Sequence, residues 1–261
     1  MKERCRKLTV TLAIGALSIG IAATPVFAEE EKPTTDLTVG AYSDYVWRGW
    51  IFSDDSIVIQ PSMTVGYKGF AMNLWGNLDT ELDDNEFGGG DTNKWNETDL
   101  TLSYDGSYGM FGYSLGYIYY ALDAAEDSQE VYAGVSLDTI LSPTLTIYNE
   151  IANYRGYYVT LDISHSIPIT EKLSLDLGAK ASYYDADKGT LTDSSGDAYE
   201  ALHDGVLSAS MTFPISEYFS ITPELYYSFP LSSDAEDEFE ASNPGSDEDI
   251  IFGGVSMSFS F

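Results

Sequence analysis

Apolar and polar residues alternate along most of the chain with a period of two. The last residues show this most clearly, because Val255, Met257, Phe259 and Phe261 alternate with glycine and serine. Residues at every second position lie on the same face of a β-strand. The final strand therefore has one apolar face, which continues to the end of the chain and needs an apolar cover.

The same alternation predicts twelve strands, and almost no segment has the period of a helix. The predicted strands are residues 37–51, 56–67, 70–78, 98–104, 110–121, 130–137, 144–153, 157–167, 173–184, 206–213, 219–229 and 250–261. An all-β fold follows from this pattern.

The connections between these strands differ in length according to their order. The long acidic connections, 81–97, 185–205 and 230–249, all follow odd-numbered strands, whereas the even-numbered strands end in short turns. Long loops at one end and short turns at the other are typical of outer-membrane barrels. We therefore predict a transmembrane antiparallel up-and-down β-barrel of about twelve strands. A secreted β-sandwich is the alternative, but it gives no reason for this sorting of loops.

The N-terminus has the pattern of an export signal. Basic residues between Lys2 and Lys7 precede an apolar run, and Val26-Phe27-Ala28 forms a small-residue cleavage site. We predict a signal peptide at 1–28, a polar lead-in at 29–36 and the barrel at 37–261, in the bacterial outer membrane. The single cysteine, Cys5, lies within the predicted signal peptide, so we expect no disulfide in the mature chain.

The end of the chain resembles the C-terminal assembly signal of outer-membrane barrels. Phe261 is the last residue and Phe259 precedes it on the same face. The resemblance implies that the barrel-assembly machinery recognises these two residues.

A formal net charge of −30 excludes nucleic acid as a natural partner. Acidic runs occur at 83–91, 234–240 and 247–249, without the regular spacing of an EF-hand loop. We predict no cofactor and no specific metal site, although the acidic loops are suited to weak binding of Ca²⁺ or Mg²⁺. Such ions would bridge the loops to lipopolysaccharide, and the other expected partners are membrane lipid and small solutes.

The segment Ser43-Asp44-Tyr45-Val46-Trp47-Arg48-Gly49 resembles the opening strand of the TorF-type porin family. Gln60-Pro61 and the stretch 69–79, which begins Gly-Phe and contains Trp75 and Asn77, match its next two strands. The chain departs from the family at Trp50, where a small residue is usual, and in its very acidic loops. The resemblance implies an outer-membrane barrel and does not identify a solute.

Catalysis is compatible with the predicted fold, because an outer-membrane lipase can be a twelve-stranded barrel. Such an enzyme needs a serine and a histidine within hydrogen-bond reach on one face. His165 shares the phase of Leu161 and Ile163, opposite to its neighbouring serines, and His203 is expected in a loop. The sequence therefore predicts that the protein is not an enzyme.

Charged residues on the inward phase of the strands are the candidates for lining a pore. The prediction places Asp44, Glu150, Asp162, Lys180 and Glu224 near mid-depth, Arg48 one alternation above Asp44, and Asp176 nearer a rim. A net negative constriction favours cations. We therefore predict a porin-like channel for passive passage of small solutes that prefers cations.

Two other interpretations stay open at this point. Arg48 and Lys180 could pair with neighbouring acids and fill a narrow barrel. A barrel of about twelve strands lies between small filled barrels and open porins. The alternative function is a non-conducting structural or adhesive barrel with acidic loops that bind divalent ions.

Overall fold

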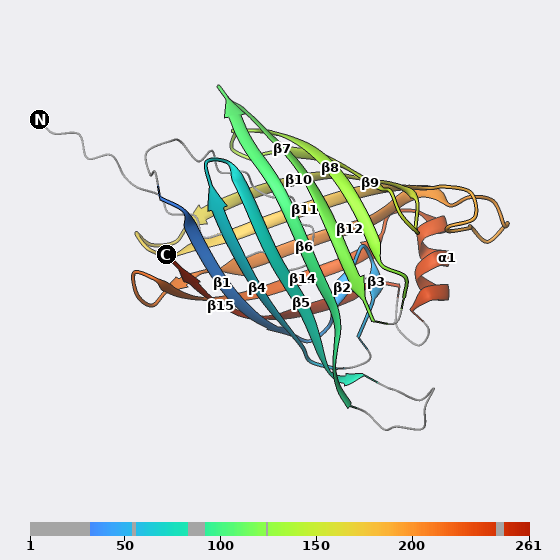
Figure 1. Ribbon diagram of the computed structural model, residues 1–261, viewed down its shortest axis with the longest axis horizontal. Helices are drawn as coiled ribbons and strands as arrows, with labels where there is room; N and C mark the ends of the chain where they lie inside the picture. The colour runs from blue at the N-terminus through green and yellow to red at the C-terminus, as the bar shows by residue number, and fades with distance from the viewer. Residues whose placement is uncertain (1–31, 54–55, 83–91, 124, 244–247) are drawn as a thin grey trace, which may run out of the picture.

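The computed structural model describes residues 32–53, 56–82, 92–123, 125–243 and 248–261. Twelve long antiparallel strands form a closed barrel (Figure 1). In order around the barrel they are β1 (Thr34–Tyr42), β4 (Val58–Tyr67), β5 (Phe70–Leu82), β6 (Thr92–Tyr108), β7 (Phe111–Leu122), β8 (Ser128–Leu137), β9 (Thr144–Glu150), β10 (Gly156–Pro168), β11 (Ser174–Ala186), β12 (Glu200–Met211), β14 (Phe219–Pro230) and β15 (Ile250–Ser260). The two-residue strand β13 (Phe213–Pro214) pairs with β14. The predicted twelve-stranded all-β barrel is confirmed.

The first and last strands close the barrel side by side. β1 pairs with β15, with Asp36 opposite Ser260, and the backbone N–H of Thr35 donates to the carbonyl of Phe261 at 3.1 Å. Both chain ends of the barrel therefore lie at one rim, which we call the terminal end. The opposite rim, which we call the loop end, carries the connection from β14 to β15 (Figure 1).

The outward faces of the strands are apolar. Each of Leu74, Leu161 and Met257 exposes about two fifths or more of its surface, and each alternates with buried inward neighbours. Many large apolar residues share this exposure around the barrel, among them Leu37, Met63, Met72, Leu102, Leu115, Val131, Leu145, Ile147, Leu177, Leu207 and Val255. Such a continuous apolar exterior fits the hydrocarbon of a membrane and not water. Among the described residues, no helix is long and apolar enough to cross a membrane.

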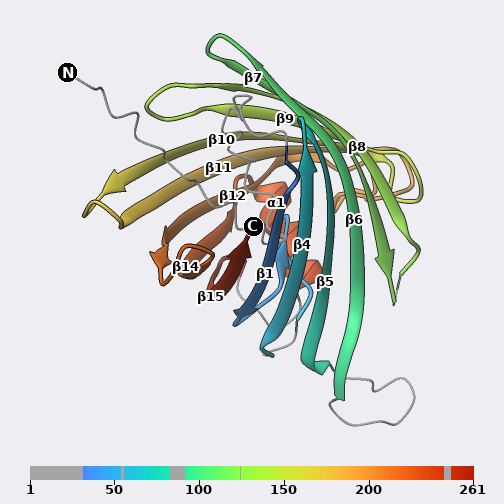
Figure 2. The same ribbon diagram turned by 60° about the vertical axis from the view of Figure 1, so that its left-hand side comes forward.

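The predicted first strand, 37–51, is wrong beyond Tyr42. β1 ends at Tyr42, and β2 (Val46–Trp47) with β3 (Trp50–Ile51) forms a separate small hairpin. The cause is the turn between them, where Arg48 has φ +53° and Gly49 φ +84°. Positive φ at both central residues makes the tight type I′ turn that reverses a hairpin. Figures 1 and 2 place this β2–β3 hairpin beside α1, at the loop end.

The long connections also differ from the prediction. The predicted loop 230–249 contains α1 (Ser233–Ser242), because Ser232 accepts the N–H of Ala235 at 3.3 Å and acidic residues occupy the first turn. β5 extends to Leu82 and β6 begins at Thr92, so the predicted loop 81–97 is shorter than expected. β12 likewise begins at Glu200, inside the predicted loop 185–205.

β1 begins at Thr34, within the stretch 29–36 that was predicted as a polar lead-in. The predicted signal peptide at 1–28 lies outside the described residues. The acidic run at 83–91 lies there as well.

Candidate functional site

The tip of the β2–β3 hairpin places Arg48 inside the barrel. Its Nη2 lies 2.8 Å from Oε2 of Glu130 on β8, and both side chains are 2% exposed. The same Glu130 oxygen accepts the Tyr120 hydroxyl at 2.8 Å. A buried ion pair of this kind is strong because little water screens it, provided that both partners are present.

The Arg48 guanidinium also lies against aromatic rings. Its Cζ is 4.3 Å from the ring centre of Trp47, 4.1 Å from that of Tyr158 and 5.4 Å from that of Tyr148. A planar guanidinium gains from stacking on ring faces as well as from its charge. The hairpin is thus held at its tip by one carboxylate and by rings of the barrel wall.

Tyr148 and Tyr158 belong to a row of tyrosines along the inner wall. Tyr132, Tyr148, Tyr158 and Tyr184 are register partners on β8, β9, β10 and β11, and all four are buried. Consecutive ring centres are 5.4, 6.0 and 6.1 Å apart. We call these four residues the tyrosine row.

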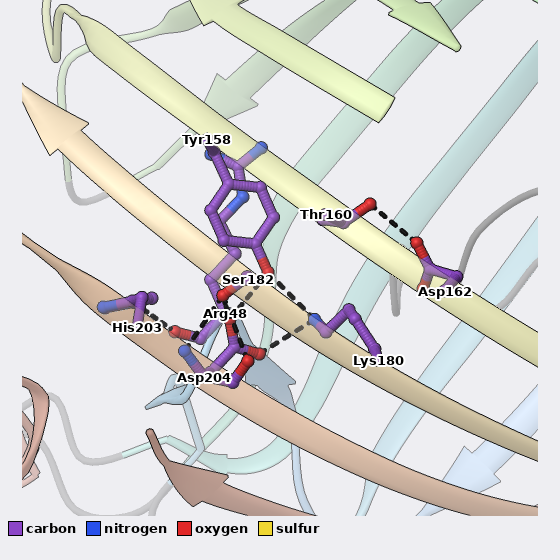
Figure 3. Close-up of polar contacts among 8 residues, drawn as sticks. All are labelled: Arg48, Tyr158, Thr160, Asp162, Lys180, Ser182, His203 and Asp204. Carbon is purple, nitrogen blue, oxygen red and sulfur yellow. Dashed lines mark hydrogen bonds and ion pairs between the residues drawn. The ribbon is translucent and has the colours of Figure 1, made fainter. Parts of the chain in front are cut away.

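A second buried ion pair, between Lys180 and Asp204, lies close to Arg48 (Figure 3). Lys180 Nζ is 2.8 Å from Asp204 Oδ2 and donates to the Tyr158 hydroxyl at 2.9 Å. That hydroxyl donates to Asp204 Oδ1 at 2.7 Å, and the Ser182 hydroxyl contacts the same carboxylate. Tyr158 therefore connects the two ion pairs, since its ring lies under Arg48 and its hydroxyl lies between Lys180 and Asp204.

An irregularity in β12 turns His203 and Asp204 together into the lumen. Ala181 pairs with Gly205 whereas Tyr183 pairs with Leu202, so the register shifts between them. Such a β-bulge inserts one extra residue and re-aims its neighbours. Both His203 and Asp204 are consequently fully buried. The predicted loop position of His203 is wrong, because β12 begins at Glu200.

His203 binds the hairpin from the side of the barrel wall. Its Nε2 lies 2.8 Å from the carbonyl oxygen of Arg48, and its Nδ1 lies 2.7 Å from the Tyr199 hydroxyl. A carbonyl oxygen only accepts, so Nε2 carries the proton and Nδ1 accepts from Tyr199. Both ring nitrogens are therefore used in contacts that do not involve a serine. His165 lies far from this cluster in the fold, and its Nδ1 lies 2.8 Å from the carbonyl oxygen of Ile140.

Helix α1 covers the hairpin at the loop end. The Asn243 side chain accepts the Ile51 N–H at 3.0 Å and donates to the Gly49 carbonyl at 3.1 Å. Trp50 Nε1 donates to Glu238 Oε1 at 3.2 Å. Phe239 is fully buried against Gly49, where an added Cβ would lie 2.1 Å from its ring. The glycine is thus required both by its positive φ and by this close contact.

The interior has a surplus of acidic groups. Among the described residues, seven buried acids face two buried basic residues, Arg48 and Lys180. The acids are Asp79, Glu97, Asp99, Glu130, Glu150, Asp162 and Asp204. Three of the carboxylate oxygens, Asp79 Oδ2, Asp99 Oδ1 and Glu150 Oε2, are buried without a hydrogen-bond partner and outside the two ion pairs. The barrel interior therefore attracts positive charge.

The predicted pore-lining residues are distributed unevenly. Arg48 lies on the hairpin and not on the first strand, and half-buried Asp44 lies between β1 and β2, so their predicted strand positions are wrong. Glu150, Asp162 and Lys180 point inward and are buried. Lys180 pairs with Asp204, although its register partner is Asp162.

Three of these acids accept hydrogen bonds from neutral donors. Glu150 accepts the Ser128 hydroxyl and the N–H of Ala152, each at 3.0 Å. Asp162 accepts the Thr160 hydroxyl at 2.7 Å. Glu224 accepts hydroxyls of Tyr42 at 3.1 Å and Ser256 at 2.7 Å. That any of these residues lines a conducting path stays a prediction.

Three other predicted residues lie toward the terminal end. Asp176 is half-buried on the inward phase of β11. At the terminal end, Phe259 stacks on Phe219 at 4.6 Å and Phe261 on Tyr218 at 5.8 Å between ring centres.

Sequence reasoning did not find the tyrosine row, His203 or Asn243 as parts of one site. A signal for the row existed, because each tyrosine lies on the polar phase of its strand, where an aromatic residue is unusual. No comparable signal existed for Asn243, which acts through its contact with a segment 194 residues away.

No group of three or more metal-binding side chains occurs among the described residues. The acidic run 234–240 lies on α1, and the run 83–91 lies outside the described residues. Weak binding of Ca²⁺ or Mg²⁺ by the acidic loops stays a prediction.

No protein-family model and no curated protein matches the chain. The resemblance to the TorF-type family therefore stays a prediction. Solved structures do match in fold. The chain is similar to the KdgM porin, with 11% identity, a TM-score of 0.54 and coverage of 87% of this chain and 99% of that one.

Two further structures have the same kind of barrel. The NanC porin is 11% identical, with a TM-score of 0.52 and coverage of 86% of this chain and 98% of that one. The COG4313 outer membrane channel from Pseudomonas putida F1 is 10% identical, with a TM-score of 0.50 and coverage of 90% and 97%. At these identities the likeness shows the fold, an outer-membrane type of barrel.

Proposed function

We propose that the protein is a porin-like channel of the bacterial outer membrane that passes small solutes passively and prefers cations. The observation that carries the proposal is the surplus of buried acids on the inward faces of the strands, seven against two basic residues among the described residues. Uncompensated carboxylates in a narrow lumen raise the local concentration of cations and lower that of anions. The apolar exterior and the fold shared with porins support the membrane location.

The difference between the two rims indicates how the barrel is oriented across the membrane. We place the terminal end in the periplasm and the loop end, with α1 and the hairpin, outside the cell, as in other outer-membrane barrels. Membrane lipid and lipopolysaccharide would then contact the exterior and the loop end. The assembly machinery would act on the terminal end, where Phe259 and Phe261 lie.

We infer that this conformation is a closed state at the loop end. The tip of the hairpin and the tyrosine row are buried there, whereas inward residues nearer the terminal end, such as Ser114 and Asp176, are half-buried. Passage of a solute therefore requires the hairpin to move from the position that α1 and Glu130 hold.

Reversal potentials in planar bilayers with a KCl gradient test the cation preference. We expect K⁺ to be preferred over Cl⁻, and the preference to fall in Asp162→Asn and Glu224→Gln and at high salt, because salt screens fixed charges. Asp187→Asn, at an exposed position beyond β11, is the control and should keep the preference. An anion-selective current would reject the proposal.

A non-conducting structural or adhesive barrel is the second candidate. The filled loop end favours it, because buried rings and two ion pairs occupy the interior at that level. Absence of any current from correctly folded protein, together with binding of Ca²⁺ or lipopolysaccharide that depends on the acidic loops, would establish this alternative.

A further inference from the structure

We propose that the wall site holding the Arg48 side chain is a recognition site for solutes with a monosubstituted guanidinium group, and that Arg48 occupies it in the closed state. The inference rests on the proposed channel function, for which it names a substrate class. The groups around the Arg48 guanidinium come mostly from the barrel wall and not from the hairpin that carries Arg48.

Those wall groups lie on four adjacent strands. Glu130 on β8 contacts Arg48 Nη2 at 2.8 Å, and Tyr120 on β7 holds that carboxylate with its hydroxyl. Tyr148 on β9 and Tyr158 on β10 present their rings to the guanidinium. Strand pairing fixes all of these residues, so the site would persist if the hairpin left.

The hairpin is held in the barrel by side-chain contacts and not by strand pairing. Its two short strands pair with each other and with no strand of the barrel. Arg48 has φ +53°, a backbone conformation that costs free energy in a residue with a side chain. A segment with few backbone bonds to its surroundings belongs to the part of a fold that opens most easily.

The geometry selects a guanidinium over other groups. The Tyr158 ring centre lies 4.1 Å from the guanidinium carbon and the Tyr148 ring centre 5.4 Å from it, and these wall rings suit a flat cation better than a tetrahedral ammonium. A neutral solute of the same shape would leave Glu130 buried without a counter-charge, and an anion would be repelled. Glu130 contacts the terminal nitrogen Nη2 and Arg48 Nε has no hydrogen-bond partner, so the site accepts a guanidinium with a substituent on one nitrogen.

The closing of the channel and the binding of solute are then competing events. An incoming guanidinium can take the place of Arg48 at Glu130 and on the tyrosine row without changing the charge of the interior. The hairpin is released by this exchange, and it returns when the solute has passed.

Binding of methylguanidinium to the folded, detergent-purified mature protein tests the inference by calorimetry. Arg48→Ala empties the wall site, and we expect saturable binding to this variant, weaker binding to the wild type, and about tenfold or greater weakening in Arg48→Ala/Glu130→Gln. Methylurea, which has a similar shape without charge, should not bind. Arg155→Ala, which removes an exposed arginine, is the matched control and should bind as the wild type does.

Equal binding of methylurea and methylguanidinium, or binding that survives Glu130→Gln unchanged, would overturn the inference. If Arg48→Ala fails to fold alone, its folded yield should be restored by millimolar methylguanidinium and not by methylurea, and the lack of such rescue would equally overturn it. Because binding is measured without a membrane, the result is independent of whether the barrel conducts.

Discussion

His203 Nε2 lies 2.8 Å from the carbonyl oxygen of Arg48, which precedes it by 155 residues. The bond joins the bulge of β12 to the turn of the β2–β3 hairpin. It satisfies a carbonyl in a left-handed turn that has no strand partner, and a buried carbonyl without a partner would be costly. The His203 ring also packs against Phe239 of α1, with ring centres 5.0 Å apart. The His203 side chain thus contacts both the hairpin and helix α1.

Substitution of His203 should loosen the hairpin. In His203→Ala the Arg48 carbonyl loses its donor and Phe239 loses a ring contact, so we expect a larger open probability in planar bilayers than in the wild type. His165→Ala removes the half-exposed histidine near the terminal end and should leave the current unchanged. Equal currents from both variants would contradict the role given to His203.

Gly49→Ala should destabilise the contact between hairpin and α1. The change places a Cβ 2.1 Å from the Phe239 ring and also strains a residue with φ +84°. Gly189→Ala is a matched control, because Gly189 has φ +93° but nothing within 4 Å of an added Cβ. Both variants carry the backbone cost of roughly 1–2 kcal/mol, and only Gly49→Ala adds the cost of the overlap, roughly 1–3 kcal/mol.

Urea unfolding in lipid vesicles measures these two glycine variants. Proteolysis of the folded protein within residues 43–53 should increase for Gly49→Ala alone. Similar losses of stability and equal cleavage in the two variants would show that Phe239 makes no specific contact with the turn.

Lys180→Met should destabilise the barrel because it leaves Asp204 buried without its cation. Removal of one partner of a buried ion pair costs about 3–5 kcal/mol. The double variant Lys180→Met/Asp204→Asn removes both charges and should recover most of the stability. Thermal unfolding followed by heat-modifiable gel migration distinguishes the two, and a single variant as stable as the wild type would show that the pair contributes little.

An arginine on the outward face should interfere with membrane insertion at mid-depth only. Leu161 and Ile169 are both 53% exposed, but Leu161 lies within β10 and Ile169 in the turn after it. Leu161→Arg should lower the stability in vesicles by about 2–4 kcal/mol, and Ile169→Arg by much less. Identical values for the two variants would contradict a lipid-facing exterior.

The role of the last residue can be separated from its packing. Phe261 and Tyr218 stack on each other at 5.8 Å, so alanine at either position removes the same ring contact. If Phe261 is part of an assembly signal, Phe261→Ala should reduce the folded fraction in the outer membrane of cells more than Tyr218→Ala does. Quantitative gels of membrane fractions measure this, and equal reductions would indicate that only packing matters.

Much of the barrel could be read from the sequence because its cause is local. A strand with one face in hydrocarbon and one in a polar interior must alternate, and Leu161, Asp162 and Ile163 show this residue by residue. The prediction failed after Tyr42, because the apolar residues of 45–51 were taken to continue the first strand, whereas the chain leaves the barrel wall there. It failed again at His203, because a bulge changes the phase and alternation alone does not reveal it.

The sequence by itself determined the twelve long strands and the face that each presents over most of its length, since these follow from period and turn residues. Only the tertiary structure decided where the charges of the interior meet. Arg48, Glu130, Tyr158 and Lys180 come from segments far apart in the chain. Their partners depend on barrel closure, strand register and the inward fold of one short hairpin, and none of these is encoded in the neighbouring residues.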